Sequence, residues 1–159
     1  MASKIKVRPM KEKDLKKLAE IYVQAYKIYS KWENWNSKTA YKLLMHYLKR
    51  QPDLAFVAEY NNEVAGAFVA GIKPWWDGNH LVEGELVVDP GYQKKGVGKL
   101  LLKSLLEKAV KKYNVTVWEA TTFKKTKFPL SWYRKLGFRE VKEWTIIGGD
   151  VRKALKKVT

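Results

Sequence analysis

Hydrophobic and polar positions follow two different periods along this chain, and the changes between them divide it into strands and helices. Alternating or short apolar runs predict strands at 5–8, 54–60, 63–72, 80–88, 115–121 and 138–147. Apolar residues three and four apart predict helices at 11–29, 37–50 and 130–136, and an amphipathic helix that ends at Lys112. The final segment, 151–158, is predicted to be another strand.

Turn-forming residues separate these segments. Asn61-Asn62 is a hairpin signal, Ser37 is a candidate N-cap, Gly137 fits a helix C-cap, and 74–79 is predicted to be a loop. We find no internal repeat, linker or low-complexity segment. The predicted order is β–α–α–β–β–β–α–β–α–β–β, in a single domain over residues 1–159.

The stretch from Glu85 to Lys112 combines a strand, a glycine loop and a helix. The apolar run Leu86–Val88 ends at Pro90-Gly91, and Gln93-Lys94-Lys95-Gly96-Val97-Gly98 leads into the helix. The first N–H groups of a helix lack intrahelical partners and carry partial positive charge. Glycines let an anion approach the main chain closely. The loop is therefore a candidate phosphate site, although it fits neither a Walker loop nor the dinucleotide fingerprint.

This strand, Gln-x-x-Gly-x-Gly loop and helix resemble the acetyl-coenzyme A motif of the GNAT superfamily of N-acetyltransferases. Tyr133 before Gly137-Phe138 is similar to the second signature of that family, and the opening 7–15 looks like its usual start. The resemblance covers essentially the whole chain. It implies an α/β fold of the GNAT type, in which a twisted mixed sheet of six or seven strands has helices on both faces.

The resemblance also implies a chemistry, namely direct transfer of an acetyl group from acetyl-coenzyme A to a primary amine of a small molecule or protein. The amine must lose a proton, and the family often carries a carboxylate for this on the central strand. Glu83 and Glu85 are the candidates, and Glu83 is preferred because it lies farther from the loop. That both simply face solvent remains an alternative. Tyr133 is the candidate acid for the departing thiolate.

Coenzyme-binding residues are transferred from the family position by position. The backbone of Leu86, Val87 and Val88 would hold the pantetheine arm. Thr126 and Pro129 stand where the family commonly has Asn and Ala, and the resemblance implies that Thr126 contacts the pantetheine arm in place of that Asn. The N–H groups of the loop would hold the pyrophosphate: Gln93, Lys94, Lys95, Gly96, Val97, Gly98 and Lys99.

Aromatic residues gather in the segments that would form the acceptor pocket. Aromatic faces bind cations and flat rings, which suits a small amine, a polyamine or a protein amine. Core packing is the competing interpretation. The candidates are Tyr26, Tyr29, Trp32, Trp35, Trp75 and Trp76.

Composition narrows the function classes further. The absence of cysteine excludes disulfides, thiol catalysis and thiolate metal sites. With two histidines, His46 and His80, we expect no metal cofactor. We expect no membrane span, no signal peptide and a cytoplasmic location.

The net charge of +16 attracts anionic partners. Two alternative functions therefore stay open: a coenzyme A-binding module without catalysis, and a basic nucleic-acid-binding protein. Only 5 of the 32 basic residues are arginine, which disfavours a dedicated nucleic-acid reader. A homodimer also stays open.

Overall fold

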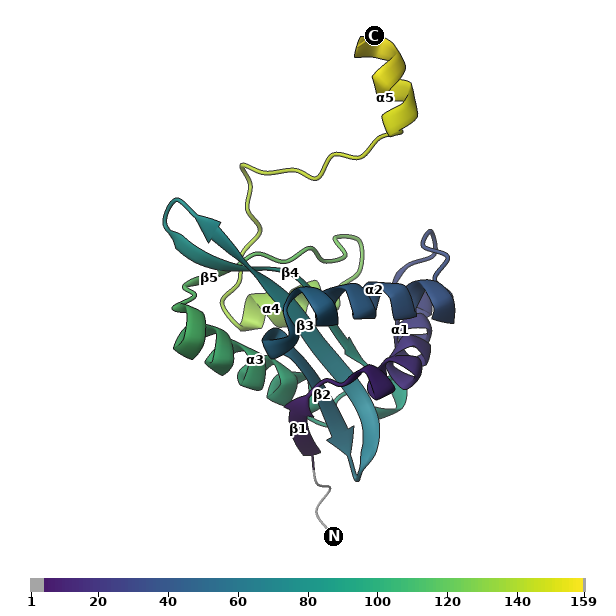
Figure 1. Cartoon of the computed structure of the whole chain (residues 1–159), viewed down its shortest axis with the longest axis vertical. Helices are drawn as coiled ribbons and strands as arrows, with labels where there is room; N and C mark the ends of the chain where they lie inside the picture. The colour runs from purple at the N-terminus through teal and green to yellow at the C-terminus, as the bar shows by residue number, and fades with distance from the viewer. Residues whose placement is uncertain (1–4, 159) are drawn as a thin grey trace. The chain divides into compact units, whose positions relative to one another are not determined.

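The structure is a computed structural model that describes residues 5–158. The chain divides after Thr121 into two compact units, which are described separately. The first unit contains β1 (Ile5–Pro9), α1 (Leu15–Tyr29), α2 (Ser37–Arg50), β2 (Ala55–Tyr60), β3 (Glu63–Trp75), β4 (Gly78–Val88), α3 (Val97–Tyr113) and β5 (Val117–Trp118), with short 3₁₀ turns at Glu12–Asp14, Pro52–Leu54 and Pro90–Tyr92 (Figure 1). The second contains α4 (Leu130–Lys135) and α5 (Val151–Val158).

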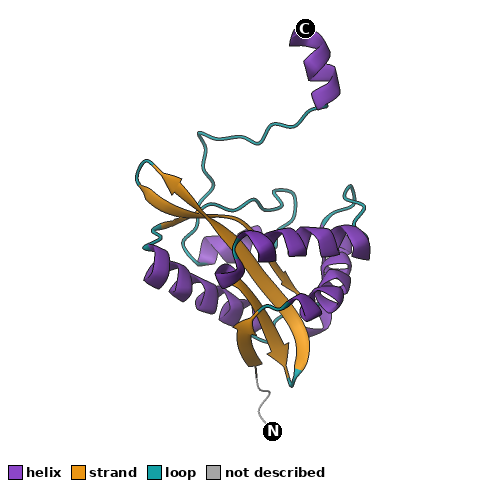
Figure 2. Cartoon of the chain, viewed as in Figure 1, coloured by secondary structure: helices purple, strands orange, loops and turns teal. Residues whose placement is uncertain are grey.

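A mixed sheet forms the centre of the first unit. Its strands lie in the order β1-β2-β3-β4-β5; the first four are antiparallel to their neighbours and β5 is parallel to β4. Figure 2 shows the sheet twisting between helices. The mixed sheet and the α/β class are confirmed, but the described residues form five strands and not the predicted six or seven.

Helices α1 and α2 pack on one face of the sheet. Their apolar stripes, including Leu18, Tyr22 and Leu44, form a buried cluster with Val69 of β3 and Val87 of β4. Neighbouring residues on a strand point to opposite faces. Val88 therefore belongs to the other face, where its side chain lies 3.5 Å from the place of a Cβ on Gly98 of α3.

Local capping explains where several helices begin and end. The Asn36 side chain accepts the N–H of Thr39 at 3.0 Å, so Asn36, and not Ser37, is the N-cap of α2. Gly137 adopts φ 92° just after α4, which confirms the predicted stop. Asn61 and Asn62, with φ of 50° and 70°, form the predicted turn between β2 and β3.

Four predicted elements differ from the structure. The strand predicted at 115–121 is reduced to the two residues of β5. Residues 138–147 form no strand, and adjacent Ile146 and Ile147, both exposed, break the alternation of a half-buried strand. Residues 151–158 form α5, because Val151, Leu155 and Val158 recur at helical spacing after Asp150, whose side chain accepts two N–H groups. Strand β3 continues to Trp75 in the predicted loop, and Gly78 at φ 131° permits a tight turn.

The second unit is basic and open. None of its described residues is buried. Residues 122–159 hold 11 of the 32 basic side chains and 3 of the 16 acidic ones, a net +8, so a quarter of the chain carries half of the net charge. Within residues 5–158, no helix combines the length and apolarity that a bilayer crossing needs.

Candidate active site

A bulge in β4 separates the two candidate carboxylates. Val82 pairs with Gly71 and Glu85 pairs with Val69, so Glu83 and Gly84 together oppose a single residue of β3. Glu83 has φ 50°, an unusual value for a residue with a side chain. A bulge redirects the side chains around it, and the two glutamates enter different surroundings.

Glu85 points into an aromatic pocket on the α1 side of the sheet. Its Oε2 accepts hydrogen bonds from the hydroxyl groups of Tyr26, at 2.8 Å, and Tyr22, at 3.2 Å. The two tyrosine rings stack with centroids 4.2 Å apart, and Trp35 packs edge-on against both. The carboxylate is thus held by neutral donors among aromatic rings.

This pocket changes the proton affinity of its ionisable groups. Burial raises the pKa of Glu85 above its usual value; the hydrogen bonds from Tyr26 and Tyr22 act in the opposite direction, and nearby Glu33 adds to the rise. Burial and the charge of Glu85 raise the pKa of both tyrosines, so they stay neutral. A carboxyl group with a raised pKa is suited to accept a proton near neutral pH.

Glu83 lies at the surface. Its carboxylate forms an ion pair with Arg50, the last residue of α2, and the two side chains are 57% and 43% exposed. The preferred base candidate of the sequence is therefore the exposed one of the two, whereas Glu85 is half-buried.

The glycine loop has the geometry of an anion site. Gly96 precedes α3 with φ 89°, a conformation that favours glycine, and its carbonyl accepts the N–H of Leu100 at 3.1 Å. A Cβ on Gly98 would make only an ordinary contact with Val88. Packing within the chain therefore does not require glycine at 98, and the missing Cβ leaves the first N–H groups of α3 open to close approach by an anion.

The outer edge of β4 is open beside this loop. Strand β5 pairs with β4 only at His80 and Leu81, and in the described structure no strand pairs with Val82–Val88 on the side away from β3. Backbone groups on a bare edge can bind an extended ligand as an added strand. Leu86, Val87 and Val88, the predicted pantetheine residues, lie on this segment.

Gln93 links the loop to its surroundings. Its side-chain amide donates to the Val88 carbonyl at 3.3 Å, and its oxygen accepts the hydroxyl of Tyr29 at 3.4 Å. Lys95 lies 5.2 Å from the ring centroids of both Tyr60 and Tyr92. Tyr29, predicted to face the acceptor, thus holds the loop against α1.

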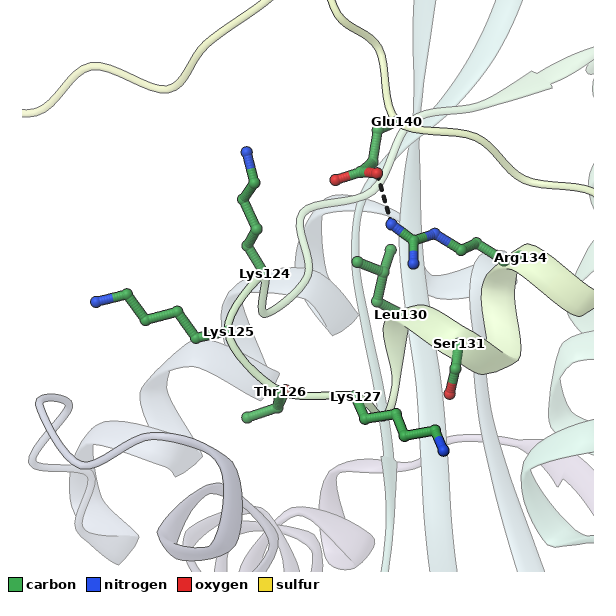
Figure 3. Close-up of a pocket in the computed structure, with 8 residues that line it drawn as sticks. All are labelled: Lys124, Lys125, Thr126, Lys127, Leu130, Ser131, Arg134 and Glu140. Atoms are coloured by element: carbon green, nitrogen blue, oxygen red, sulfur yellow. Dashed lines mark hydrogen bonds and ion pairs between the residues drawn. The ribbon is translucent and has the colours of Figure 1, made fainter.

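The second unit carries the other predicted site residues. Tyr133 lies in α4 between the rings of Trp132, at 5.2 Å, and Phe138, at 6.1 Å. The buried Oγ1 of Thr126 has no hydrogen-bond partner among the described residues. Thr126 lines an open hollow of about 470 Å³ with three lysines, which point away from one another, and with Arg134, which donates to Glu140 at 2.6 Å (Figure 3).

The predicted acceptor aromatics separate into groups. Tyr26 and Trp35 join the Glu85 pocket, whereas Trp32 is exposed. Trp75 and Trp76 lie at the tip of the β3–β4 hairpin, seven residues along β4 from Glu85, or roughly 20 Å at strand spacing.

The sequence reasoning missed three residues near Glu85. Tyr22 was assigned only to the core, although it lies one helical turn from Tyr26 on the same face. Burial and the charges of Glu85 and Glu83 raise the pKa of Tyr47, and Arg50 opposes that rise, so the Tyr47 hydroxyl lies within electrostatic reach of all three. Tyr47 and Arg50 are three residues apart on α2, and this spacing could have indicated that they lie on the same face of that helix.

A buried ionisable group occupies the other end of β4. His80 is 4% exposed, its Nδ1 lies 2.5 Å from Glu119 and its Nε2 lies 2.7 Å from Asp77. Lys73 donates to the other oxygen of Glu119 at 2.9 Å. The hydrogen bond with Glu119 is the main cause that raises the pKa of His80. Both ring nitrogens are occupied, and within residues 5–158 no group of three or more acidic, histidine or cysteine residues is placed to hold a metal ion.

Comparisons with known proteins agree with this geometry. The profile of the acetyltransferase (GNAT) family matches residues 15–138, which cover most of the chain. An uncharacterised N-acetyltransferase of Methanocaldococcus jannaschii is 30% identical over 147 residues, 87% of this chain; the match spans 63% of that relative's length.

Two solved structures share the fold. A Pyrococcus horikoshii OT3 protein has a TM-score of 0.72 and 28% identity, with 90% of this chain and 94% of that chain covered. A Clostridium acetobutylicum protein described as a predicted acetyltransferase with acetyl-CoA has a TM-score of 0.72 and 18% identity, with 91% and 96% covered.

Proposed function

Because the chain belongs to the acetyltransferase (GNAT) family, we propose that it is an N-acetyltransferase that moves the acetyl group of acetyl-coenzyme A directly to a primary amine. The family match at 15–138 crosses both units, which supports their action as one domain over 1–159. The observation that carries the proposal is the Glu85 pocket, which lies on the unpaired segment Val82–Val88 of the β4 edge that leads to the glycine loop.

Acetyl-coenzyme A is the proposed co-substrate. Its pantetheine arm would pair with the bare edge at Leu86–Val88, and its pyrophosphate would bind the N–H groups from Gln93 to Lys99, with charge from the loop lysines. Thr126 stays the proposed site of a further pantetheine hydrogen bond. A protein described with acetyl-CoA shares this fold, which supports the assignment.

We assign Glu85, in place of Glu83, as the general base. It would take a proton from the acceptor ammonium, directly or through water, and the free amine would attack the thioester carbonyl carbon. Collapse of the tetrahedral intermediate breaks the C–S bond, and Tyr133 would protonate the departing thiolate. The nitrogen would lose its second proton to water, and Tyr133 and Glu85 would return to their starting protonation states by exchange with solvent. The products are the N-acetylated amine and coenzyme A.

Calorimetric titration with acetyl-coenzyme A tests the co-substrate. We expect binding at micromolar concentrations, and Gly98→Ala should weaken it by about tenfold or more, since a methyl group would meet the phosphate (about 1.4 kcal/mol per factor of ten). Gly148→Ala is the matched control, because nothing lies within 4 Å of its added Cβ. Absence of binding to the unaltered protein would refute the proposal.

Thiol release with a broad panel of amines tests catalysis and separates an enzyme from a coenzyme-binding module. Tyr133→Phe keeps the ring contacts with Trp132 and Phe138 but removes the hydroxyl. We expect unchanged binding of acetyl-coenzyme A and turnover lowered by roughly 100-fold, the scale of general acid catalysis. Unchanged turnover would remove Tyr133 from the mechanism.

A further inference from the structure

We propose that Arg50 binds an oxyanion on the acetyl acceptor, so that the preferred acceptor is a primary amine that also bears a carboxylate or phosphate group. This inference rests on the proposed function and deepens it, because it names the class of acceptor. It starts from the surface ion pair at the β4 bulge, to which the proposed acetyl transfer gives no role.

Arg50 is held over the sheet next to this bulge. It ends α2, and its guanidinium lies against Gly71 of β3, where a Cβ would be 3.9 Å from both Cζ and Nε. Because Gly71 has no side chain, the guanidinium lies directly over the backbone of β3, and Glu83 of β4 bonds to it. The only interaction found for the Arg50 side chain within the described residues is the bond from its Nη1 to Glu83.

Arg50 and the proposed base belong to one site. The Tyr47 hydroxyl is under the electrostatic influence of Glu85, Glu83 and Arg50 at the same time. Glu85 and Glu83 also meet helices of the same face of the sheet, Glu85 at α1 and Glu83 at α2. An amine at Glu85 therefore has Arg50 as a cation on the same face of the sheet for any second polar group that it carries.

The pair between Arg50 and Glu83 is suited to exchange. Both side chains are substantially exposed, at 43% and 57%, and ion pairs of this kind contribute little net stability. A guanidinium has five N–H donors in a planar fork that matches carboxylate and phosphate oxygens, and Glu83 takes one of them. Glu83 thus occupies the position of an acceptor oxyanion in the free protein.

The net charge of the chain indicates which member of the Arg50–Glu83 pair binds the second polar group of the acceptor. In the opposite assignment, Glu83 would bind a second ammonium group of a polyamine. A chain of net charge +16 repels polycations and attracts anions. A hollow of about 210 Å³ beside Tyr26 and Trp35 is also lined by Lys27 and Lys31, against one acid, Glu33. The field around the pocket therefore favours an anionic acceptor.

Matched acceptor pairs test the inference. The probes are ω-amino acids with one to five methylene groups between amine and carboxylate, each paired with its amide. A second pair, 2-aminoethyl phosphate and ethanolamine, distinguishes phosphate from carboxylate. We expect kcat/KM to be roughly 10- to 100-fold higher for the best acid than for its amide, the scale of one charged hydrogen-bonded contact.

Three variants locate this preference. Arg50→Gln should raise KM for the acid to the level of the amide and leave acetyl-coenzyme A binding unchanged. Lys49→Gln removes the same charge from the neighbouring exposed residue and should keep the preference. Glu83→Gln frees Arg50 and should lower KM for the acid several-fold, whereas the polyamine assignment predicts a higher KM for cationic acceptors.

The outcomes separate the two levels of the argument. If no amine is acetylated although acetyl-coenzyme A binds, the proposed function fails. If amines are acetylated but acids and amides react equally, this inference alone is overturned. Equal loss of preference in Arg50→Gln and Lys49→Gln would also overturn it, because the general field would then be responsible.

Discussion

The two ends of β4 hold an ionisable group in opposite ways. At His80, near the start of the strand, two carboxylates bind both ring nitrogens, and the main one, Glu119, raises the pKa of the imidazole. At Glu85, near the end, neutral phenols donate to the carboxylate, and burial raises its pKa against them. The two carboxylates stabilise the charged form of His80, whereas the charged form of Glu85 has hydrogen-bond donors but no ion-pair partner.

This difference separates a stabilising cluster from a reactive group. When a buried charged group has ion-pair and hydrogen-bond partners, those partners stabilise its charged form. A half-buried carboxylate without an ion-pair partner binds protons more readily than in water, and such groups are typical of active sites. On the proposed mechanism, the same strand anchors the hairpin at one end and carries the general base at the other.

Glu85→Gln should produce the largest effect. The variant keeps the shape and the tyrosine contacts but cannot accept a proton, so kcat should fall about 100- to 10,000-fold, the range of general base catalysis. The free energy of unfolding should stay the same or rise, because an enclosed charge is removed. Glu107→Gln, on an exposed position of α3, is the control for steady-state kinetics and urea unfolding. A kcat that stays within threefold would remove Glu85 as the base.

His80→Phe should reverse this pattern. The ring is replaced at similar size, but the bonds to Glu119 and Asp77 are lost, so the free energy of unfolding should fall by about 2 kcal/mol. kcat should change by less than about twofold, because His80 lies far along β4 from Glu85. Asp77→Asn, which affects one of the two bonds, should cost less. Loss of activity in a folded His80→Phe protein would contradict the separation of the two ends.

The pH dependence should show the smallest effect. His80 has a raised pKa in the folded state, so its contribution is complete below about pH 6.5 and is lost as pH rises through the folded pKa. The raised pKa of Glu85 also makes the free energy of unfolding fall as pH rises, but at lower pH than for His80. The protonated form of Glu85 stabilises the fold, and it is lost as pH rises above about 4.5. Activity should rise over that earlier window because the base must be ionised.

Thermal unfolding between pH 6 and 9 checks the histidine contribution. The decline in Tm with pH should be smaller in His80→Phe than in the unaltered protein. Rate measurements between pH 4.5 and 7 check Glu85, and a rate that falls as pH rises there would contradict its role as a base.

Patterns of short range were enough to predict much of the fold. The hairpin at Asn61-Asn62, the stop at Gly137 and the amphipathic faces of α1, α2 and α3 each depend on neighbouring residues, and the structure confirms them. The glycine loop before α3 was also predictable, because helix starts have a local signature. These local features were sufficient to predict the family and the α/β architecture from the sequence.

Contacts between distant segments limited the prediction of the site. The sequence placed Glu83 and Glu85 on one strand, but the bulge depends on register with Val69 and Gly71 of β3. Tyr22 and Tyr26 meet Glu85 across about sixty residues of chain. In 151–158, the strand prediction was wrong because the helical spacing of Val151, Leu155 and Val158 was not recognised.

The open edge of β4 has a consequence for handling the protein. Unsatisfied strand edges are templates on which other chains add and aggregate, and Val82–Val88 form such an edge within the described structure. On the proposed binding mode, acetyl-coenzyme A would cover this edge as an added strand. Bound co-substrate would then protect the edge from aggregation. The backbone groups that hold it for catalysis would therefore also determine the solubility of the protein.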